Sequence, residues 1–71
     1  MNNDDKIRAC YQHCCLKYVQ QEAKMTNKTL RGRLNIPESN YPAASKIISQ
    51  TVKAGKVKES EKSKEYIPFW A

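Results

Sequence analysis

The clearest alternation of hydrophobic and polar positions lies between Asn40 and Gly55. At about 100° per residue, one face of a helix over this stretch collects apolar side chains and the opposite face collects polar ones. The apolar face comprises Ala44, Ile47, Ile48, Thr51 and Val52. The polar face comprises Lys46, Ser49, Gln50 and Lys53. This pattern predicts one amphipathic helix that packs on a small core.

The ends of this helix carry recognisable signals. Asn40 is a suitable N-cap, because its side-chain oxygen can accept from a free backbone N–H of the first turn. Pro42 falls in that first turn, where its missing N–H removes no helical hydrogen bond. Gly55 follows at the point where the chain must leave the helix, and glycine adopts the left-handed conformation without steric cost.

Two further helices are predicted before this one. The first runs from about Asp4 to Glu22 and is the scaffold on which the others pack. Its apolar positions are Ile7, Cys10, Tyr11, Cys14, Cys15, Tyr18 and Val19. After an extended link at Lys24–Met25, Thr26 caps a second helix, in which Met25 and Leu30 are placed to form a hydrophobic staple. Leu34 faces inward together with Leu30, and the helix stops before Pro37.

After Gly55 the spacing of hydrophobic residues changes from the helical period to the two-residue alternation of strands. Lys56-Val57-Lys58 and Glu65-Tyr66-Ile67 read as two strands, joined by the polar run 59–64. Val57 and Ile67 are expected to face the core, and Pro68 to end the second strand. Phe69 and Trp70 follow, with too much apolar area to leave in water. They are expected to pack against the first helix, with a partner interface as the alternative.

Helix, helix, turn, helix and hairpin is the order of elements in a winged helix-turn-helix. The predicted fold class is therefore α+β and mostly helical, with three helices and a two-stranded wing. A chain of 71 residues makes one domain.

Charge points toward polyanionic partners. The net charge is +6, of which the first 25 residues carry +1 and the remainder +5. Such a bias favours nucleic acids, although a solvated basic surface without a partner is the simpler alternative. No apolar run approaches the length of a membrane span, and the N-terminal residues lack the apolar core of a signal peptide. The sequence predicts a cytoplasmic protein without a membrane partner.

The cluster Cys10, His13, Cys14 and Cys15 raises the question of a metal site. His13 is predicted to point off the apolar stripe, and no other Cys or His occurs to complete a tetrahedral set. Three cysteines also do not make a secreted disulfide framework. We therefore interpret the cysteines as reduced core residues, with no metal and no cofactor in this domain.

The stretch TNKTLRGRLNIPESNYPAASKIISQTVKAGKVK together with KEYIPFWA resembles a known family. It is similar to the C-terminal winged-helix segment of a group of bacterial transcriptional regulators. Those proteins carry an upstream Schlafen/AlbA-type divergent ATPase-like domain and are often labelled as related to the RecG helicase. The resemblance covers Met25 to Ala71, and it departs from the family's pattern at Gly32 and Asn35. It implies a DNA-associated regulator of which this chain is a C-terminal fragment.

On this interpretation the third helix enters the major groove of double-stranded DNA and presents Lys46, Ser49, Gln50 and Lys53. The start of the second helix contacts phosphates through Thr26, Lys28 and Arg31. The wing reaches the backbone or minor groove through Lys62 and Lys64. A homodimer, or contact with the upstream domain, is a further possible partner.

A second hypothesis keeps the fold without the DNA contacts. The chain would then be a protein-interaction or dimerisation module, with the terminal aromatics as its contact surface. The absence of arginine from the third helix favours this alternative, because arginine is the commonest reader of guanine. No catalytic constellation is present in the sequence, so no enzyme activity is expected.

Overall fold

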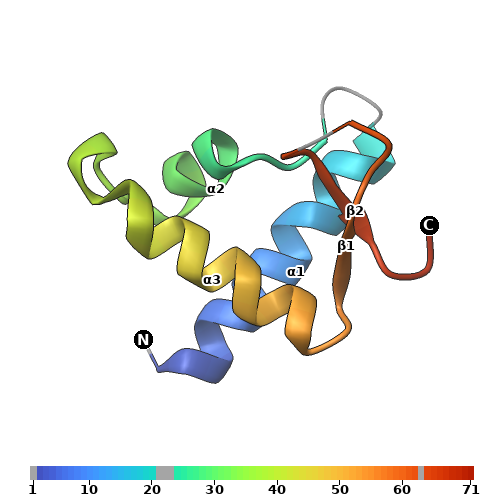
Figure 1. Cartoon of the computed structure of the whole chain (residues 1–71), viewed down its shortest axis with the longest axis horizontal. Coiled ribbons are helices and arrows are strands. Elements are labelled where there is room, and N and C mark those ends of the chain that lie inside the picture. The colour runs from blue at the N-terminus through green and yellow to red at the C-terminus, as the bar shows by residue number, and fades with distance from the viewer. Residues whose placement is uncertain (1, 21–23, 63) are drawn as a thin grey trace.

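The computed structural model of the chain describes residues 2–20, 24–62 and 64–71. Three α-helices are followed by a two-stranded antiparallel hairpin (Figure 1). The elements are α1 (Asn3–Gln20), α2 (Asn27–Leu34), the 3₁₀ turn η1 (Glu38–Asn40), α3 (Tyr41–Lys53), β1 (Val57–Glu59) and β2 (Tyr66–Pro68). The fold is α+β and mostly helical in a winged helix-turn-helix layout, as the sequence predicts.

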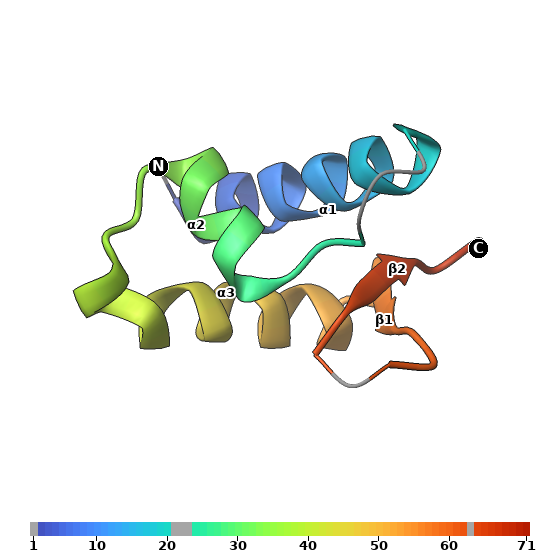
Figure 2. The same cartoon turned by 90° about the horizontal axis from the view of Figure 1, so that it is seen from above.

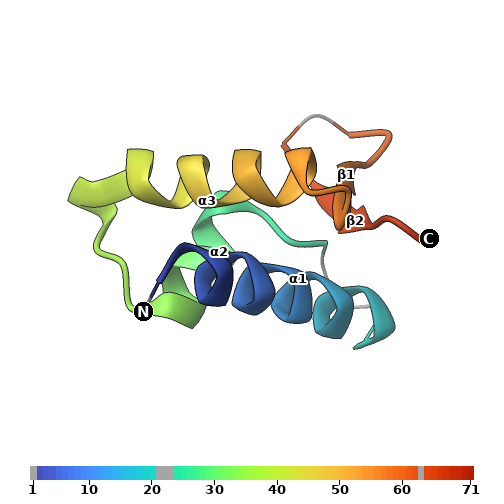
Figure 3. The same ribbon diagram turned by 90° about the horizontal axis from the view of Figure 1, so that it is seen from below.

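The helices form two layers. In the view of Figure 2, α1 and α3 form two separate rows, with α2 towards one end of the pair and the hairpin at the other. The view from below shows the same separation, with the outer side of α3 uncovered along its length (Figure 3). No helix in the described ranges is both long enough and apolar enough to cross a bilayer.

The start of α2 follows its sequence signals. The Thr26 hydroxyl accepts from the backbone N–H of Thr29, and the Thr29 hydroxyl accepts from the backbone N–H of Thr26. This reciprocal capping box satisfies two donors that a helix start leaves free. Met25 and Leu30 are both fully buried in the core, as the predicted staple requires. Met25 also lies in an extended link, since it forms an isolated antiparallel bridge with Tyr66.

The C-terminal ends of α2 and α3 use left-handed residues. Asn35 ends α2 at φ 56°, and the N–H of Ile36 then donates to the carbonyl oxygen of Arg31 at 2.9 Å. Gly55 ends α3 at φ 76°, as predicted, and its N–H donates to the carbonyl oxygen of Val52. Asparagine and glycine are the residues that reach this conformation most readily. Asn35 is therefore compatible with the left-handed turn that ends α2.

Asn40 is the N-cap position of α3, as predicted, but its side chain forms no capping hydrogen bond. The reason is the 3₁₀ turn over residues 38–40, which leaves Asn40 at φ −110° and ψ 32°, outside the extended conformation from which an N-cap side chain reaches the first turn. Pro42 lies in the first turn of α3, as the sequence predicts.

The hairpin has a different register from the one expected. Val57 pairs with Pro68, Lys58 with Ile67 and Glu59 with Tyr66. Because side chains alternate between faces along a strand, Val57 shares its face with Pro68 and not with Ile67. Val57 and Pro68 are buried and Ile67 is half-buried. The prediction that Ile67 faces the core beside Val57 is therefore wrong, although Pro68 does end the strand.

A small core joins all the elements. It comprises Cys10, Cys14, Met25, Leu30, Ala44, Ile47, Ile48 and Val57, with Tyr11, Leu34, Ile36 and Tyr66 packed against it. Three positions predicted on the packed faces of the helices are exposed. Val52 is 40% exposed because it lies a further 100° round α3 from buried Thr51. Tyr18 and Val19 are 37% and 66% exposed because they lie beyond the last turn of α1 that the core covers. The predicted end of α1 at Glu22 lies outside the described residues.

His13 is buried, with 7% of its surface exposed, so its predicted position off the packed face is wrong. The cause is α2, which covers this side of α1. His13 Nε2 lies 3.1 Å from the hydroxyl oxygen of Thr29, the same hydroxyl that completes the capping box. Burial, together with the charges of Lys17 and Arg33, lowers the pKa of His13.

This burial predicts a stability that falls on acidification. Unfolded His13 binds a proton near its ordinary pKa of about 6.5, whereas the folded state resists protonation to a lower pH. The contribution of His13 to the free energy of unfolding should therefore stay constant above about pH 6.5. It should decrease as the pH falls toward 5. Urea denaturation across this range measures the effect. His13→Gln, which can still bond Thr29, should show a shallower decrease, and a curve parallel to that of the unmodified chain would contradict the prediction.

Candidate nucleic-acid interface

The outer face of α3 carries three of the predicted groove residues. Lys46, Ser49 and Lys53 are exposed. They lie opposite the buried arc of Ala44, Ile47, Ile48 and Thr51, which is the placement that the amphipathic pattern predicts. Gln50 is half-buried, and at 100° per residue it lies on the flank of α3 next to Ala43. Lys46, Ser49 and Lys53 therefore form the centre of the candidate interface and Gln50 lies at its edge.

A polar hollow of about 260 Å³ lies where α2, α3 and the hairpin loop meet. Its lining residues are Asn27, Tyr41, Ser45, Ile48, Ser49, Lys64 and Tyr66. Two predicted site residues from different elements, Ser49 of α3 and Lys64 of the wing, thus line one depression. The wing is therefore placed beside the outer face of α3.

Asn27 joins the two helices of the helix-turn-helix. Its Nδ2 donates to Ser45 Oγ at 2.9 Å and to the backbone carbonyl oxygen of Tyr41 at 3.3 Å. The sequence reasoning missed Asn27, Tyr41 and Ser45 as members of the site. One signal was available, since Asn27 and Arg31 are four residues apart on a helix and such pairs face each other.

The three residues of α2 predicted to contact phosphates differ in how exposed their polar groups are. Lys28 is exposed. Thr26 is half-buried, and its hydroxyl is already engaged in the capping box. Arg31 is half-buried against the ring of Tyr41. Lys28 is therefore free to reach a phosphate, whereas Arg31 is partly covered by Tyr41. Thr26 orders the helix start instead of presenting a free hydroxyl.

The two predicted wing residues are both accessible to DNA. Lys62 and Lys64 are exposed. The backbone of Lys64 is left-handed, with φ 68°, and its N–H donates to Glu59 Oε2 at 3.1 Å. The N–H of Lys62 donates to the hydroxyl oxygen of Ser60 at 3.2 Å. The backbone on both sides of the loop is thus held by side chains, while the two ammonium groups lie in solvent.

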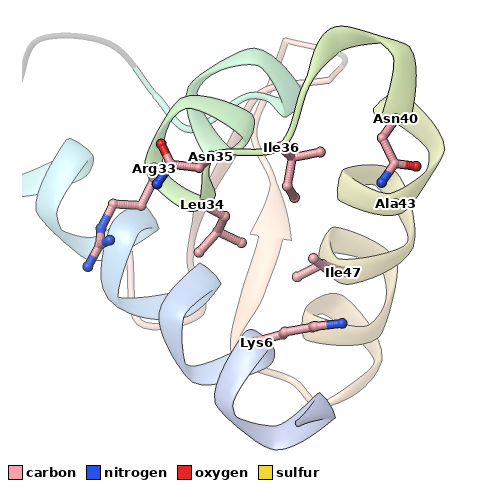
Figure 4. Close-up of a pocket in the computed structure, with 8 residues that line it drawn as sticks. All are labelled: Lys6, Arg33, Leu34, Asn35, Ile36, Asn40, Ala43 and Ile47. Atoms are coloured by element: carbon pink, nitrogen blue, oxygen red, sulfur yellow. The ribbon is translucent and has the colours of Figure 1, made fainter. Parts of the chain in front are cut away.

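A second hollow, of about 440 Å³, lies on the other flank of α3, between α1 and the turn that follows α2 (Figure 4). Leu34, Ile36 and Ile47 point into it, whereas Arg33 turns away (Figure 4). Lys6 extends across one edge (Figure 4). Its walls are therefore mainly apolar, and it is separate from the polar hollow that Ser49 and Lys64 line.

An apolar patch covers the second half of α1 and the segment after β2. Phe69 and Trp70 are 52% and 50% exposed. The inner face of each ring contacts α1, because Phe69 stacks on Tyr11 with centroids 6.1 Å apart and Trp70 meets Tyr18 edge-on at 5.5 Å. The indole N–H of Trp70 donates to the hydroxyl oxygen of Tyr11 at 3.0 Å. The predicted packing against the first helix is confirmed, and about half of each ring remains in solvent.

The cysteines lie within α1 as core residues. Cys10 and Cys14 are fully buried, and Cys15 is half-buried. Burial, and then the neighbouring thiols of Cys10 and Cys15, raise the pKa of Cys14 to about 12. Since metals and electrophiles react with the thiolate, a thiol of this pKa is a packing group at neutral pH. Among the residues described, no group of three or more His, Cys, Asp or Glu side chains is arranged to hold a metal ion.

Comparisons of the chain with models of protein families, with curated proteins and with solved structures find no match.

Proposed function

We propose that the chain is a double-stranded DNA-binding module of a bacterial transcriptional regulator. The observation that carries this proposal is the joint placement of the α3 face and the wing. Ser49 and Lys64 line one depression, with Lys46 and Lys53 exposed on the same outer side of α3. A helix that is free along its outer side fits the major groove, and a basic loop beside it is placed to meet the adjacent backbone.

The charge supports the same proposal. The net charge of +6 is concentrated in the part of the chain that builds α2, α3 and the wing. Lysines there attract the phosphate backbone without distinguishing sequences, whereas Ser49 and Gln50 are the α3 side chains able to read base edges. A single module of this size supplies few contacts, so binding is expected to be weak and strongly dependent on salt.

Replacing Lys46 and Lys53 together with alanine should weaken duplex binding and leave stability nearly unchanged, because both side chains are exposed. Each lost phosphate contact should lower the dependence of log K on log salt by about 0.9. Titrations of duplex DNA at several salt concentrations measure both quantities. Gln50→Ala should instead alter the preference among sequences.

The location of amide shifts separates DNA binding from its alternative. Duplex DNA should perturb amides of residues 43–53 and of the wing loop. Perturbation confined to Phe69 and Trp70 would contradict the proposal. Lys17→Ala with Lys24→Ala is a matched control, since it removes the same charge from outside α2, α3 and the wing. It should weaken binding much less.

The alternative is a protein-interaction or dimerisation module that does not bind DNA. The apolar patch favours it. Half-exposed Phe69 stacks on Tyr11, and Tyr11 lines an apolar depression on α1 together with exposed Leu16 and Val19. Contiguous apolar patches of this kind often mark contact surfaces. The patch lies on α1 and the segment after β2, whereas the proposed DNA face lies on α3 and the wing loop, so substitutions in one surface can be tested without altering the other.

A further inference from the structure

Two neighbours from different helices hold Arg31 in one orientation. Its Nε donates to Asn27 Oδ1 at 2.7 Å, and its guanidinium carbon lies 5.5 Å from the centroid of the Tyr41 ring. Asn27 is itself fixed by its bonds to Ser45 and to the backbone of Tyr41. The guanidinium is therefore positioned across the junction of α2 and α3.

The remaining donors of Arg31 suit a phosphate. A guanidinium has five N–H donors, and here one of them is used by Asn27. Within the part of the chain that the structure describes, the two terminal NH₂ groups have no hydrogen-bond partner. Two such groups in one plane match two oxygens of a phosphate. Because the side chain is already oriented, binding immobilises fewer rotamers than it would for a freely rotating lysine.

We propose that Arg31 is a preorganised contact for one phosphate of the DNA backbone, and that Asn27 and Tyr41 are its positioning residues. This inference rests on the proposed DNA-binding function. Asn27 and Tyr41 also line the polar hollow shared by Ser49 and Lys64, so the contact adjoins the surface offered by α3 and the wing. The bound phosphate would fix the register of α3 on the duplex without reading sequence.

The first test compares two arginines of α2. Arg31→Ala should weaken binding of a fluorescently labelled mixed-sequence duplex about tenfold, as expected for a charge-assisted bond. It should also lower the salt slope by about 0.9. Arg33→Ala removes the same charge from the same helix, but from an exposed side chain outside the network, and should cost only about twofold. Equal losses for the two variants would overturn the inference.

The second test concerns the positioning residues. Tyr41→Leu should weaken binding about threefold by removing the ring beneath the guanidinium, whereas Tyr41→Phe, which keeps the ring, should bind normally. Asn27→Ala should also weaken binding. The salt slope should stay unchanged in both, and neither substitution should reduce affinity further in an Arg31→Ala background. Equal losses with and without Arg31 would show that Asn27 and Tyr41 act only on stability, which overturns their assigned role.

Failure of this inference differs from failure of the proposed function. If the Lys46 and Lys53 substitutions weaken binding while Arg31→Ala behaves like Arg33→Ala, only the phosphate contact is wrong. If the unmodified chain binds no duplex at low salt, the DNA-binding function is wrong and the contact is wrong with it.

Discussion

Leu30→Ala should remove a large part of the stability of the domain. Leu30 is fully buried, and α2 has only eight residues with which to attach itself to the core. Replacing a buried leucine with alanine costs about 3 kcal/mol through lost transfer free energy and the cavity that remains. A domain of 71 residues has a free energy of unfolding of roughly 4–10 kcal/mol. Between roughly a third and three quarters of the stability would therefore be lost.

Thermal melting followed by circular dichroism measures this effect. For a domain of this size, 1 kcal/mol shifts Tm by about 4–8 °C, so a decrease of roughly 15 °C is expected. Leu16→Ala is the matched control, because it makes the same chemical change on a helix at a side chain that is 54% exposed. Its Tm should change little. Similar decreases for the two variants would mean that Leu30 does not anchor α2.

Removal of residues 69–71 should lower the free energy of unfolding by about 2 kcal/mol. Complete burial of the two aromatic rings would make the cost 3 kcal/mol or more, but Phe69 and Trp70 are about half exposed. What is lost is one stacked pair and one edge-on pair, each contributing about 0.5–1.5 kcal/mol, and the bond from Trp70 to Tyr11. Melting of the shortened chain measures the difference.

A second variant and the duplex affinity show whether residues 69–71 stabilise the fold or serve a partner. Trp70→Phe keeps a ring on Tyr18 but removes the N–H donor, so it should lower stability by less than about 1 kcal/mol. A shortened chain that melts within a degree or two of the full one would show that the rings serve a partner instead of the fold. Under the DNA-binding proposal the truncation should leave duplex affinity unchanged, provided that the shortened chain is folded.

Features of this fold could be predicted where they depend on residues close to one another in the sequence. The N-cap at Thr26 and the left-handed glycine at position 55 depend on neighbours only a few residues away, and both predictions are confirmed. The amphipathic period of α3 likewise places Ala44, Ile47, Ile48 and Thr51 in the core. These features follow from backbone geometry and helical period alone.

Errors arose where a distant segment decides. His13 is buried because α2 folds over it, and its bond to Thr29 joins residues 16 positions apart. Ile67 turned out to be half-buried because the register pairs Pro68 with Val57, a choice that strand period alone does not make. The error at Asn40 is local instead, because the 3₁₀ turn over residues 38–40 takes this N-cap residue out of the conformation in which its side chain would bond.

For the candidate site, the sequence identified the exposed lysines of α3 and the wing but not their surroundings. Helical period is enough to place Lys46 and Lys53 outward. The network of Asn27, Ser45 and Tyr41 depends on the contact between two helices, which no single-helix pattern describes.

The bridge between Met25 and Tyr66 has a consequence for the order of folding. An isolated two-stranded hairpin is marginally stable at best in water, and here its second strand is tied to the link between α1 and α2 through the bond from the N–H of Tyr66 to the carbonyl oxygen of Met25. Pairs so distant along the chain form late, because the loop between them must close first. We therefore expect the helices to assemble first and the hairpin to form last, so that the basic loop of the proposed DNA surface takes its position only once the rest of the domain has folded.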